Sequence, residues 1–169
     1  MECTYHWDSP LGGITMAAEG HALTGLWFDG GKAPAAAFSA DCTRRFLPVF
    51  AEAERWLELY FSGRNPGFTP PLDLRGTAFR REVWEILSAV PYGRTVSYGQ
   101  VAEIIAARKK TGRLSAQAVG NAVAHNPVLL IVPCHRVVGA DGSLTGYAGG
   151  TERKRRLLEL EQEGVLSCF

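Results

Sequence analysis

The chain has 169 residues and contains, at positions 126–138, the run NPVLLIVPCHRVV. Its apolar centre, residues 128–132, predicts a strand buried on both faces, because a strand covered on both sides has apolar residues in succession rather than in alternation. The Asn126-Pro127 pair ends the segment before it, since a residue that precedes proline avoids the helical conformation. Cys134 is therefore expected just beyond the end of a buried strand.

Cys134 is followed by a histidine and an arginine, and a nearby imidazole or positive charge favours the nucleophilic thiolate. Successive residues of an extended chain point to opposite sides, so His135 meets Cys134 only if a turn begins there or a water links the two. Glu161, on a last helix that begins at Thr151, is a candidate for the carboxylate that orients the imidazole. From the residues alone, a reactive thiol and a buried apolar filler both remain open.

The first part of the chain predicts a small sheet and one helix. Short apolar runs between residues 5 and 28 alternate with turns that contain Gly or Pro, which is typical of a meander of strands. Residues 48–61 change to helical spacing, with one face formed by Val49, Ala53, Trp56, Leu57 and Tyr60. Residues 62–71 contain three prolines and two glycines, so we expect a loop there and two lobes, 1–75 and 76–169.

The second lobe predicts helices with recognisable caps. Thr77 is the expected N-cap of a helix whose buried side carries Phe79, Val83, Ile86, Leu87 and Val90. Ser97 and Gln100 form a capping box. The helix after this box is expected to turn Ile104 and Ile105 inward and to fade near Ala107.

A basic connection, RKKTGR at 108–113, leads to a short helix at 116–125 that Ser115 caps. Its small residues suit close approach to a nucleic-acid groove and suit tight helix packing equally well, so both interpretations stay open. The charge distribution favours a nucleic-acid partner. Residues 91–156 carry ten Lys and Arg against three Asp and Glu, whereas residues 1–75 carry six against nine.

Composition excludes several classes of protein. With 46% hydrophobic and 21% charged residues, the chain has the balance of a globular protein. No apolar run approaches the ~20 residues of a membrane helix, and the N-terminus lacks the features of a signal peptide, so we expect a soluble, cytoplasmic protein. The four cysteines, which form no close pair, are expected to be reduced thiols. A zinc site is not expected, because no compact motif is formed by Cys3, His6, His21 and Cys42.

The run IVPCHRVVG (131–139), followed by LTGYAGG (144–150), resembles the active-site signature of the O6-alkylguanine-DNA alkyltransferases, or methylated-DNA–protein-cysteine methyltransferases. The likeness covers nearly the whole chain. It extends to SPLG (9–12), FRREVW (79–84), VSYGQ (96–100), Lys154, Leu157-Leu158 and Glu161. A Pro-Cys-His-Arg-Val motif followed at this distance by Gly-Tyr-x-Gly-Gly is highly specific, so it argues strongly against the filler interpretation of Cys134.

The resemblance implies a fold and a reaction. The family fold has an N-terminal ribonuclease-H-like α/β lobe and a mainly α C-terminal lobe, whose winged-helix-like helix-turn-helix binds the minor groove of double-stranded DNA. A flipped nucleotide, O6-alkylguanine or as a further candidate O4-methylthymine, gives its alkyl group to a cysteine. The thioether is stable, so no cofactor is needed and each molecule acts once. We expect a monomer at the bacterial nucleoid or in a eukaryotic nucleus.

Residue roles follow from the same resemblance. Cys134 is the acceptor, His135 deprotonates it through a water, Glu161 holds the imidazole, and Tyr98 rotates the phosphate and protonates the departing purine. The residues expected to bind substrate are Tyr147, Ala148, Gly149, Gly150, Asn126, Val137 and Lys154. Those expected to contact DNA are Gln117, Ala116, Ser97, Arg113 and Arg136. Asn126, as a tie to the active-site turn, and Arg136, as a partner within the protein, are also expected to be structural.

The sequence departs from the family pattern in two places. Many members have an arginine that fills the gap left by the flipped base, where this chain has Gln117. Glutamine can hydrogen-bond to the orphaned cytosine but lacks the charge. The connection 108–114 is also longer than in many relatives. We hypothesise that its cations, Arg108, Lys109, Lys110 and Arg113, recover the missing phosphate affinity.

Three other functions fit the residues less well. A lesion sensor with the same fold would lack the cysteine that is present here. A transcriptional regulator would carry a second DNA-binding module or a cysteine-rich regulatory extension. A cysteine hydrolase would need a remote histidine in a recognisable motif, because the adjacent His135 is awkwardly placed for a dyad.

Overall fold

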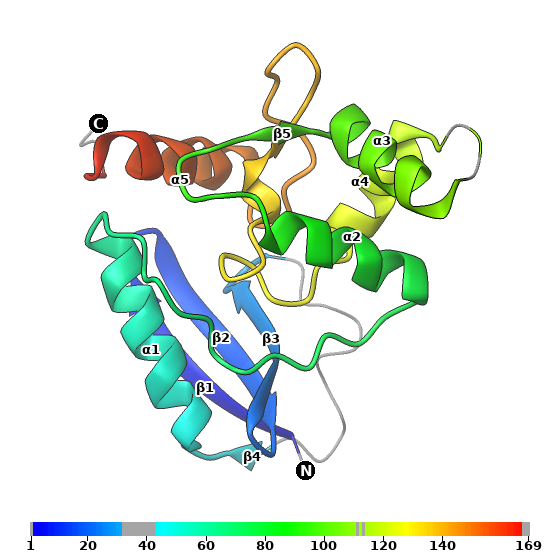
Figure 1. Ribbon diagram of the computed structural model, residues 1–169. Coiled ribbons are helices and arrows are strands. Elements are labelled where there is room, and N and C mark those ends of the chain that lie inside the picture. Colours follow the sequence, from blue (N-terminus) through cyan, green and yellow to red (C-terminus); the bar gives the residue numbers. More distant parts are fainter. Residues whose placement is uncertain (1, 32–42, 111, 113, 167–169) are drawn as a thin grey trace.

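The computed structural model describes residues 2–31, 43–110, 112 and 114–166. They form two lobes in sequence order (Figure 1). The first lobe consists of β1 (Glu2–Ser9), β2 (Gly12–Glu19), β3 (Ala22–Phe28), β4 (Thr43–Arg44) and α1 (Pro48–Phe61). The second consists of α2 (Ala78–Ser88), β5 (Val96–Ser97), α3 (Tyr98–Lys109), α4 (Ala116–Ala124), the 3-10 turn η1 (Cys134–Arg136), β6 (Val137–Val138) and α5 (Thr151–Glu163).

The first lobe is a sheet of order β3-β2-β1-β4, in which β1 to β3 form the predicted antiparallel meander. Helix α1 lies along this sheet (Figure 1). Its predicted apolar face is confirmed, because Val49, Ala53, Trp56, Leu57 and Tyr60 are all buried, together with Phe50. Apolar side chains from the helix and the sheet therefore form a common core.

The predicted caps of the second lobe are confirmed. Thr77 Oγ1 accepts a hydrogen bond from the Arg80 amide, and Ser115 Oγ accepts one from the Ala118 amide. At α3 both halves of the capping box are present: Ser97 Oγ accepts from the Gln100 amide, and Gln100 Oε1 accepts from the Ser97 amide. Each cap uses residues within one turn, which is why a local pattern predicts it.

The buried sides of α2 and α3 are partly as predicted. On α2, Val83, Ile86 and Leu87 are buried, whereas Phe79 is only half-buried. Val90 is also half-buried and lies beyond the end of the helix at Ser88. On α3, Ile105 is buried but Ile104 is 40% exposed. Neighbours on an α-helix point about 100° apart, and here only the direction of Ile105 faces the core. The helix also continues two residues beyond Ala107, to Lys109.

The prediction of a strand at 128–132 is wrong. Only Val128 makes a bridge, to Leu26, and the chain then turns. The amide of Ile131 donates to the carbonyl of Leu129, and Leu130 has a positive φ of 71°. All five residues are buried. The apolar run therefore forms a compact buried turn between the lobes. An uninterrupted apolar pattern indicates burial, but it does not distinguish a buried turn from a buried strand.

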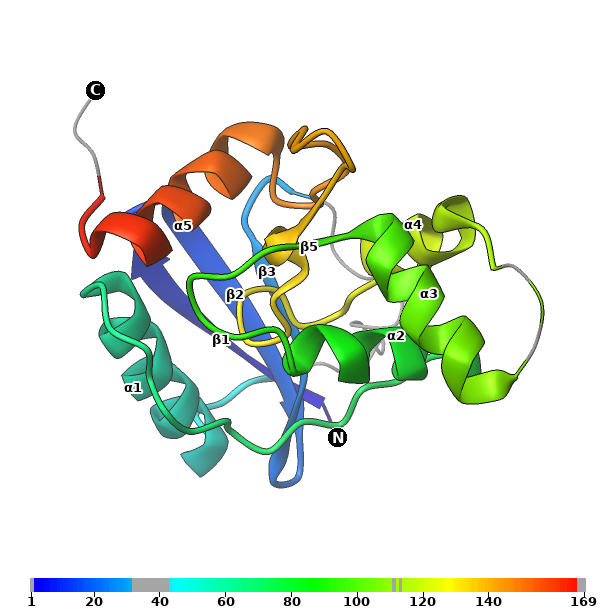
Figure 2. The ribbon, with the colours of Figure 1, turned by 45° about the horizontal axis from the view of Figure 1, so that its top comes forward.

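The two lobes are joined by backbone and side-chain contacts. The outer edge of β3 is hydrogen-bonded to the segment that precedes Cys134. The Leu26 amide donates to Pro127 O (2.9 Å), and the Leu129 amide donates to Leu26 O (3.0 Å). The C-terminal ends of α1 and α5 also lie together, as both ribbon views show (Figures 1 and 2). Within the described part of the chain, no helix is long and apolar enough to cross a membrane.

Candidate active site

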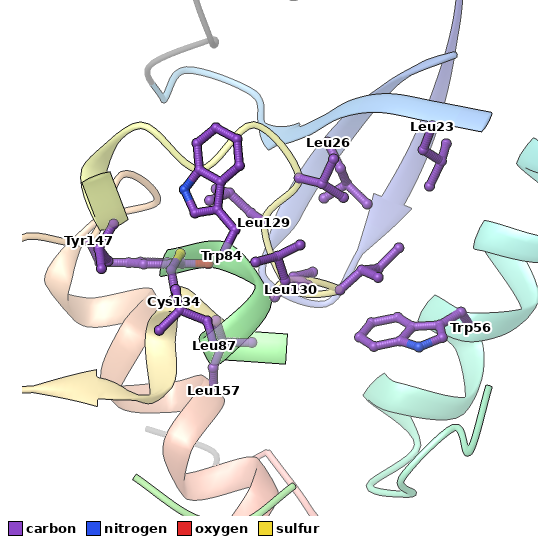
Figure 3. Close-up of a cluster of buried hydrophobic side chains, with 14 of the residues drawn as sticks. Leu23, Leu26, Trp56, Trp84, Leu87, Leu129, Leu130, Cys134, Tyr147 and Leu157 are labelled. Carbon is purple, nitrogen blue, oxygen red and sulfur yellow. The ribbon is translucent and has the colours of Figure 1, made fainter. Parts of the chain in front are cut away.

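Cys134 opens the 3-10 turn η1, which is one of the two arrangements expected for a Cys-His pair. Its amide donates to Val132 O at 2.8 Å, and the residue is 3% exposed. Figure 3 shows it among buried side chains that include Leu87, Leu130 and Tyr147. The compact turn thus delivers a thiol into an apolar core rather than to the surface.

His135 and Glu161 are brought together from η1 and α5. The His135 ring is fully buried, and its Nε2 forms a hydrogen bond with Glu161 Oε2. A carboxylate only accepts hydrogen bonds, so Nε2 carries the proton in this pair. The other ring nitrogen, Nδ1, is buried without a hydrogen-bond partner among the described residues. Nδ1 is therefore available as a proton acceptor.

Glu161 receives four donors on its two oxygens. Oε1 accepts from Arg136 Nε at 2.7 Å and from the Gly93 amide at 3.0 Å. Oε2 accepts from His135 and from the hydroxyl of Tyr60 at 2.7 Å. Burial acts to raise the pKa of this carboxyl, but the hydrogen bond from His135 and the charge of Arg136 oppose burial, and the pKa is lowered to about 2. Glu161 is therefore a buried anion.

The imidazole and the thiol are both held in their neutral forms. Burial lowers the pKa of His135, although Glu161 opposes this shift. Burial raises the pKa of the Cys134 thiol to about 11, and a side-chain hydrogen bond from Asn126 and the charge of Lys154 only partly oppose it. The resting site is thus a thiol beside a neutral base, and the thiolate forms only when a proton is taken away.

Tyr98 and Lys154 meet at one carbonyl. The Tyr98 hydroxyl donates to Thr145 O at 3.1 Å, and Lys154 Nζ donates to the same oxygen at 3.0 Å. Lys154 is 1% exposed, and burial lowers its pKa. Burial, and then the negative charge that Cys134 acquires on ionisation, raise the pKa of Tyr98. Both residues lie close enough to the thiol to sense its charge, and both hold the start of the loop 145–150.

Tyr147 and the glycines after it form the rest of that loop. Tyr147 is 9% exposed, its ring meets His135 edge to face at 6.3 Å, and its buried hydroxyl has no hydrogen-bond partner among the described residues. Gly149 packs under it, because a Cβ there would lie 2.5 Å from the Tyr147 ring. Ala148 is half-buried, and Gly150, with a φ of 94°, caps α5. The loop backbone therefore lies directly against an aromatic ring.

Asn126 and Val137 flank the turn. The Asn126 amide donates to Val132 O at 2.9 Å, while its oxygen accepts from the Val128 amide at 3.0 Å. These bonds clamp the compact turn across six residues, the geometry of a structural tie. Val137 is fully buried in β6, where it pairs with Val96.

The predicted DNA contacts divide into two groups. Ala116 and Gln117 are exposed in the first turn of α4, and Ser97 is half-buried with its hydroxyl engaged in the α3 cap. Arg136 is 7% exposed and bonded to Glu161 and to Val90 O, so the structure shows the expected pairing within the protein, and its contact with DNA stays a prediction. Its apolar surroundings, together with the anion, hold it inside. Arg113 lies outside the described residues.

Two cations of the connection 108–113, Arg108 and Lys109, have partners on α2. Lys109 Nζ lies 3.2 Å from Glu82 and over the ring of Phe79, and Arg108 lies 3.8 Å from Glu85. These pairs are largely exposed and therefore weak. Among the described residues, no group of three His, Cys, Asp or Glu could hold a metal ion. His6 is instead bonded to Asp29, and Cys42 lies outside the described part of the chain.

Sequence reasoning missed Tyr60 as a site residue and placed it only in the core of α1. Its ring stacks on Trp56 at 5.2 Å, and its hydroxyl reaches Glu161 across the lobe boundary. The two residues are 101 positions apart, and no motif links them. The Gly93 amide was missed for the same reason.

Cys134 and His135, in the turn that follows two short capped helices, and Glu161 on α5 form a buried Cys-His-Glu set, which defines a protein with a nucleophilic thiol. Comparison with known proteins gives the family. Residues 2–74 match "6-O-methylguanine DNA methyltransferase, ribonuclease-like domain", and residues 78–163 match the DNA binding domain of the same family. The chain belongs to the 6-O-methylguanine DNA methyltransferase family.

Relatives and solved structures agree with this assignment. A methylated-DNA–protein-cysteine methyltransferase of Mycobacterium bovis is 45% identical over 158 residues, covering 92% of this chain and 89% of the relative. One from Methanosarcina acetivorans is 41% identical, covering 91% and 94%. The crystal structure of Mycobacterium tuberculosis OGT in complex with DNA matches with a TM-score of 0.83 at 44% identity, covering 98% of this chain and 95% of that one.

Proposed function

We propose that this protein repairs alkylated DNA by moving the alkyl group of O6-alkylguanine irreversibly to Cys134. The observation that carries the proposal is the buried Cys134-His135-Glu161 set, in which His135 Nε2 is bonded to Glu161 and Nδ1 is left as a proton acceptor. A neutral thiol needs a base that is not protonated at rest, and burial lowers the pKa of His135.

The step balances in atoms and electrons. The thiol proton passes through a water to His135 Nδ1, and the Sγ lone pair attacks the alkyl carbon while the carbon–O6 bond breaks. The electron pair stays on the purine, which takes a proton from the Tyr98 hydroxyl, and Tyr98 regains one from the imidazolium or solvent. Glu161 stabilises the imidazolium that forms. The thioether has no leaving group that water can displace, so the protein acts once.

The remaining roles concern access and binding. Cys134 is 3% exposed, so the nucleotide must be flipped out of the duplex to reach it. Tyr147, Val137 and the backbone of 148–150 would line its pocket, and Ala116 and Gln117 would enter the minor groove. The hydrogen bonds of Asn126 would fix the turn before Cys134, and the bond from Lys154 to Thr145 O would fix the start of the loop 145–150.

We further propose that the chain divides into lobes at 1–75 and 76–169 and that it acts as a monomer on double-stranded DNA. Its location would be that of the DNA, at the nucleoid in the cytoplasm of a bacterium or in the nucleus of a eukaryote. The family matches at 2–74 and 78–163 support the lobe boundary, and the DNA complex of a 44% identical structure supports the partner.

A titration tests the function. Limiting protein is mixed with an excess of duplex that carries O6-methylguanine, and the repaired guanine is counted. We expect the yield to reach a plateau at one repaired guanine per protein molecule, and we expect no repaired guanine with Cys134→Ser. Binding without repair would favour the lesion sensor, and repair well beyond one equivalent would contradict an irreversible thioether.

A further inference from the structure

Tyr60 belongs to the first lobe, in the last turn of α1, but its hydroxyl lies in the site of the second lobe. It is fully buried and donates to Glu161 Oε2 at 2.7 Å, and the same oxygen accepts from His135 Nε2. The hydroxyl is also 3.3 Å from Nε2. Because a carboxylate has no proton to give, the phenol is the donor in the shorter bond.

The ring of Tyr60 is held on several sides. Trp56 stacks on it with an interplanar angle of 7°, and Phe61, Tyr92 and His135 meet it at 75–90°. A ring packed in this way cannot turn its hydroxyl away without disturbing its neighbours. The phenol therefore remains on Oε2, whatever happens at the thiol.

From this geometry we infer that Tyr60 is a positioning residue for alkyl transfer, which sets the share of the Glu161 charge that reaches His135. The inference rests on the proposed function. The hydrogen bond from the phenol stabilises part of the negative charge on Oε2, so this oxygen attracts a proton on the imidazole less strongly. The imidazole therefore remains neutral, with its lone pair on Nδ1. Without the phenol, the full charge of Oε2 would act on His135 and would favour the imidazolium.

The other charges around His135 do not replace this effect. Glu161 is the anion that favours the imidazolium, while Arg136, Lys154 and burial oppose it. Tyr147 also meets the His135 ring edge to face, but its buried hydroxyl has no hydrogen-bond partner among the described residues. Cys134 adds a negative charge only after it has given up its proton. Tyr60 is thus the one neutral donor among the described residues that shares Oε2 with His135.

The test compares Tyr60→Phe with Tyr92→Phe. Tyr92 is a matched control, because its ring belongs to the same aromatic group while its buried hydroxyl has no hydrogen-bond partner among the described residues. The titration of His135 is followed by NMR of protein labelled with 15N-histidine, and the single-turnover rate of methyl transfer is measured against pH. A thermal melt of each variant reports folding separately.

We expect the acid limb of the rate profile to move to higher pH by about one unit in Tyr60→Phe, since a hydrogen bond to a charged group and one pKa unit are of similar size. At a pH on that limb the rate falls about tenfold, and on the plateau by less than about twofold. The NMR titration of His135 moves in the same direction. Tyr92→Phe leaves both curves in place.

Coincident His135 titrations of wild type and folded Tyr60→Phe would overturn the inference. If Tyr60→Phe does not fold, the wild type still decides, because the inference requires a protected Tyr60 hydroxyl proton with a cross-peak to the His135 ring and an Nε2–H tautomer. An Nδ1–H tautomer would overturn it. The NMR titration does not depend on methyl transfer, so failure of the proposed function would show separately, as wild-type protein that transfers no methyl group.

Discussion

Arg136 and Glu161 form a buried ion pair, with Nε donating to Oε1 over 2.7 Å. The arginine is the residue after His135, and the carboxylate also holds His135, so one anion fixes two successive side chains of the turn. The guanidinium closes the set with a bond to Val90 O at 2.8 Å. The Cys-His-Arg motif thus contains both the base, His135, and the cation, Arg136, that balances the charge of Glu161.

Replacement of Arg136 by methionine should therefore destabilise the protein strongly. It leaves the Glu161 anion buried with fewer partners, and breaking one side of a buried pair typically costs about 3–5 kcal/mol. Urea unfolding measures the decrease. Arg155→Met is the control, because Arg155 pairs with Glu152 and Glu159 on the exposed side of α5 and should change the midpoint little. Equal midpoints for the two variants would contradict the buried pair.

The Cys134 thiol should make stability depend on alkaline pH. Burial raises its pKa to about 11 from 9.0. Its contribution is complete below pH 9, where the thiol is neutral in both states, and is lost as pH rises toward 11, because the unfolded chain ionises first. Relative to Cys134→Ser, wild type should lose about 3 kcal/mol of unfolding free energy over this window. Urea titrations of both proteins at each pH measure it, and parallel curves would count against a buried thiol.

The local structure and the Cys134-His135-Glu161 set were largely predictable, but the contacts that join distant parts of the chain at the site were not. The box of Ser97 and Gln100 lies within one helical turn, so the sequence predicts it directly. The turn at 128–132 depends on the positive φ of Leu130, which apolar composition does not reveal. Glu161 was identified because a histidine needs a carboxylate and the family has one there. Tyr60 was not, because only the packing of α1 against α5 brings it to the site.

Gln117 should limit the capture of the flipped nucleotide. The side chain is exposed at the second position of α4. Gln117→Arg restores a charge that can stack and attract phosphate, so we expect single-turnover transfer to quicken about three- to tenfold at low salt. Gln117→Ala should slow it, because nothing fills the gap in the duplex. Rapid-quench measurements of methyl transfer give both rates. If the alanine variant matches wild type, Gln117 does not intercalate.

The basic connection should contribute to the salt dependence of DNA binding, though less than four cations would suggest. Arg108 and Lys109 already have partners on α2. Changing Arg108, Lys109, Lys110 and Arg113 together to glutamine should lower the slope of log K against log salt by about 0.9 for each phosphate that the variant no longer neutralises. Arg64→Gln, in an exposed position of the first lobe, is the control. An unchanged slope in the fourfold variant would show that the connection does not bind phosphate.

The mass of the protein after one encounter with substrate tests the central claim most directly. Wild type is incubated with a duplex that carries O6-methylguanine, and its intact mass and peptide map are recorded beside those of Cys134→Ser. We predict a gain of one methyl group in wild type, located on the peptide that contains Cys134, and no gain in the variant. A methyl group on another residue, or none on a protein that still binds the duplex, would contradict the transfer to Cys134.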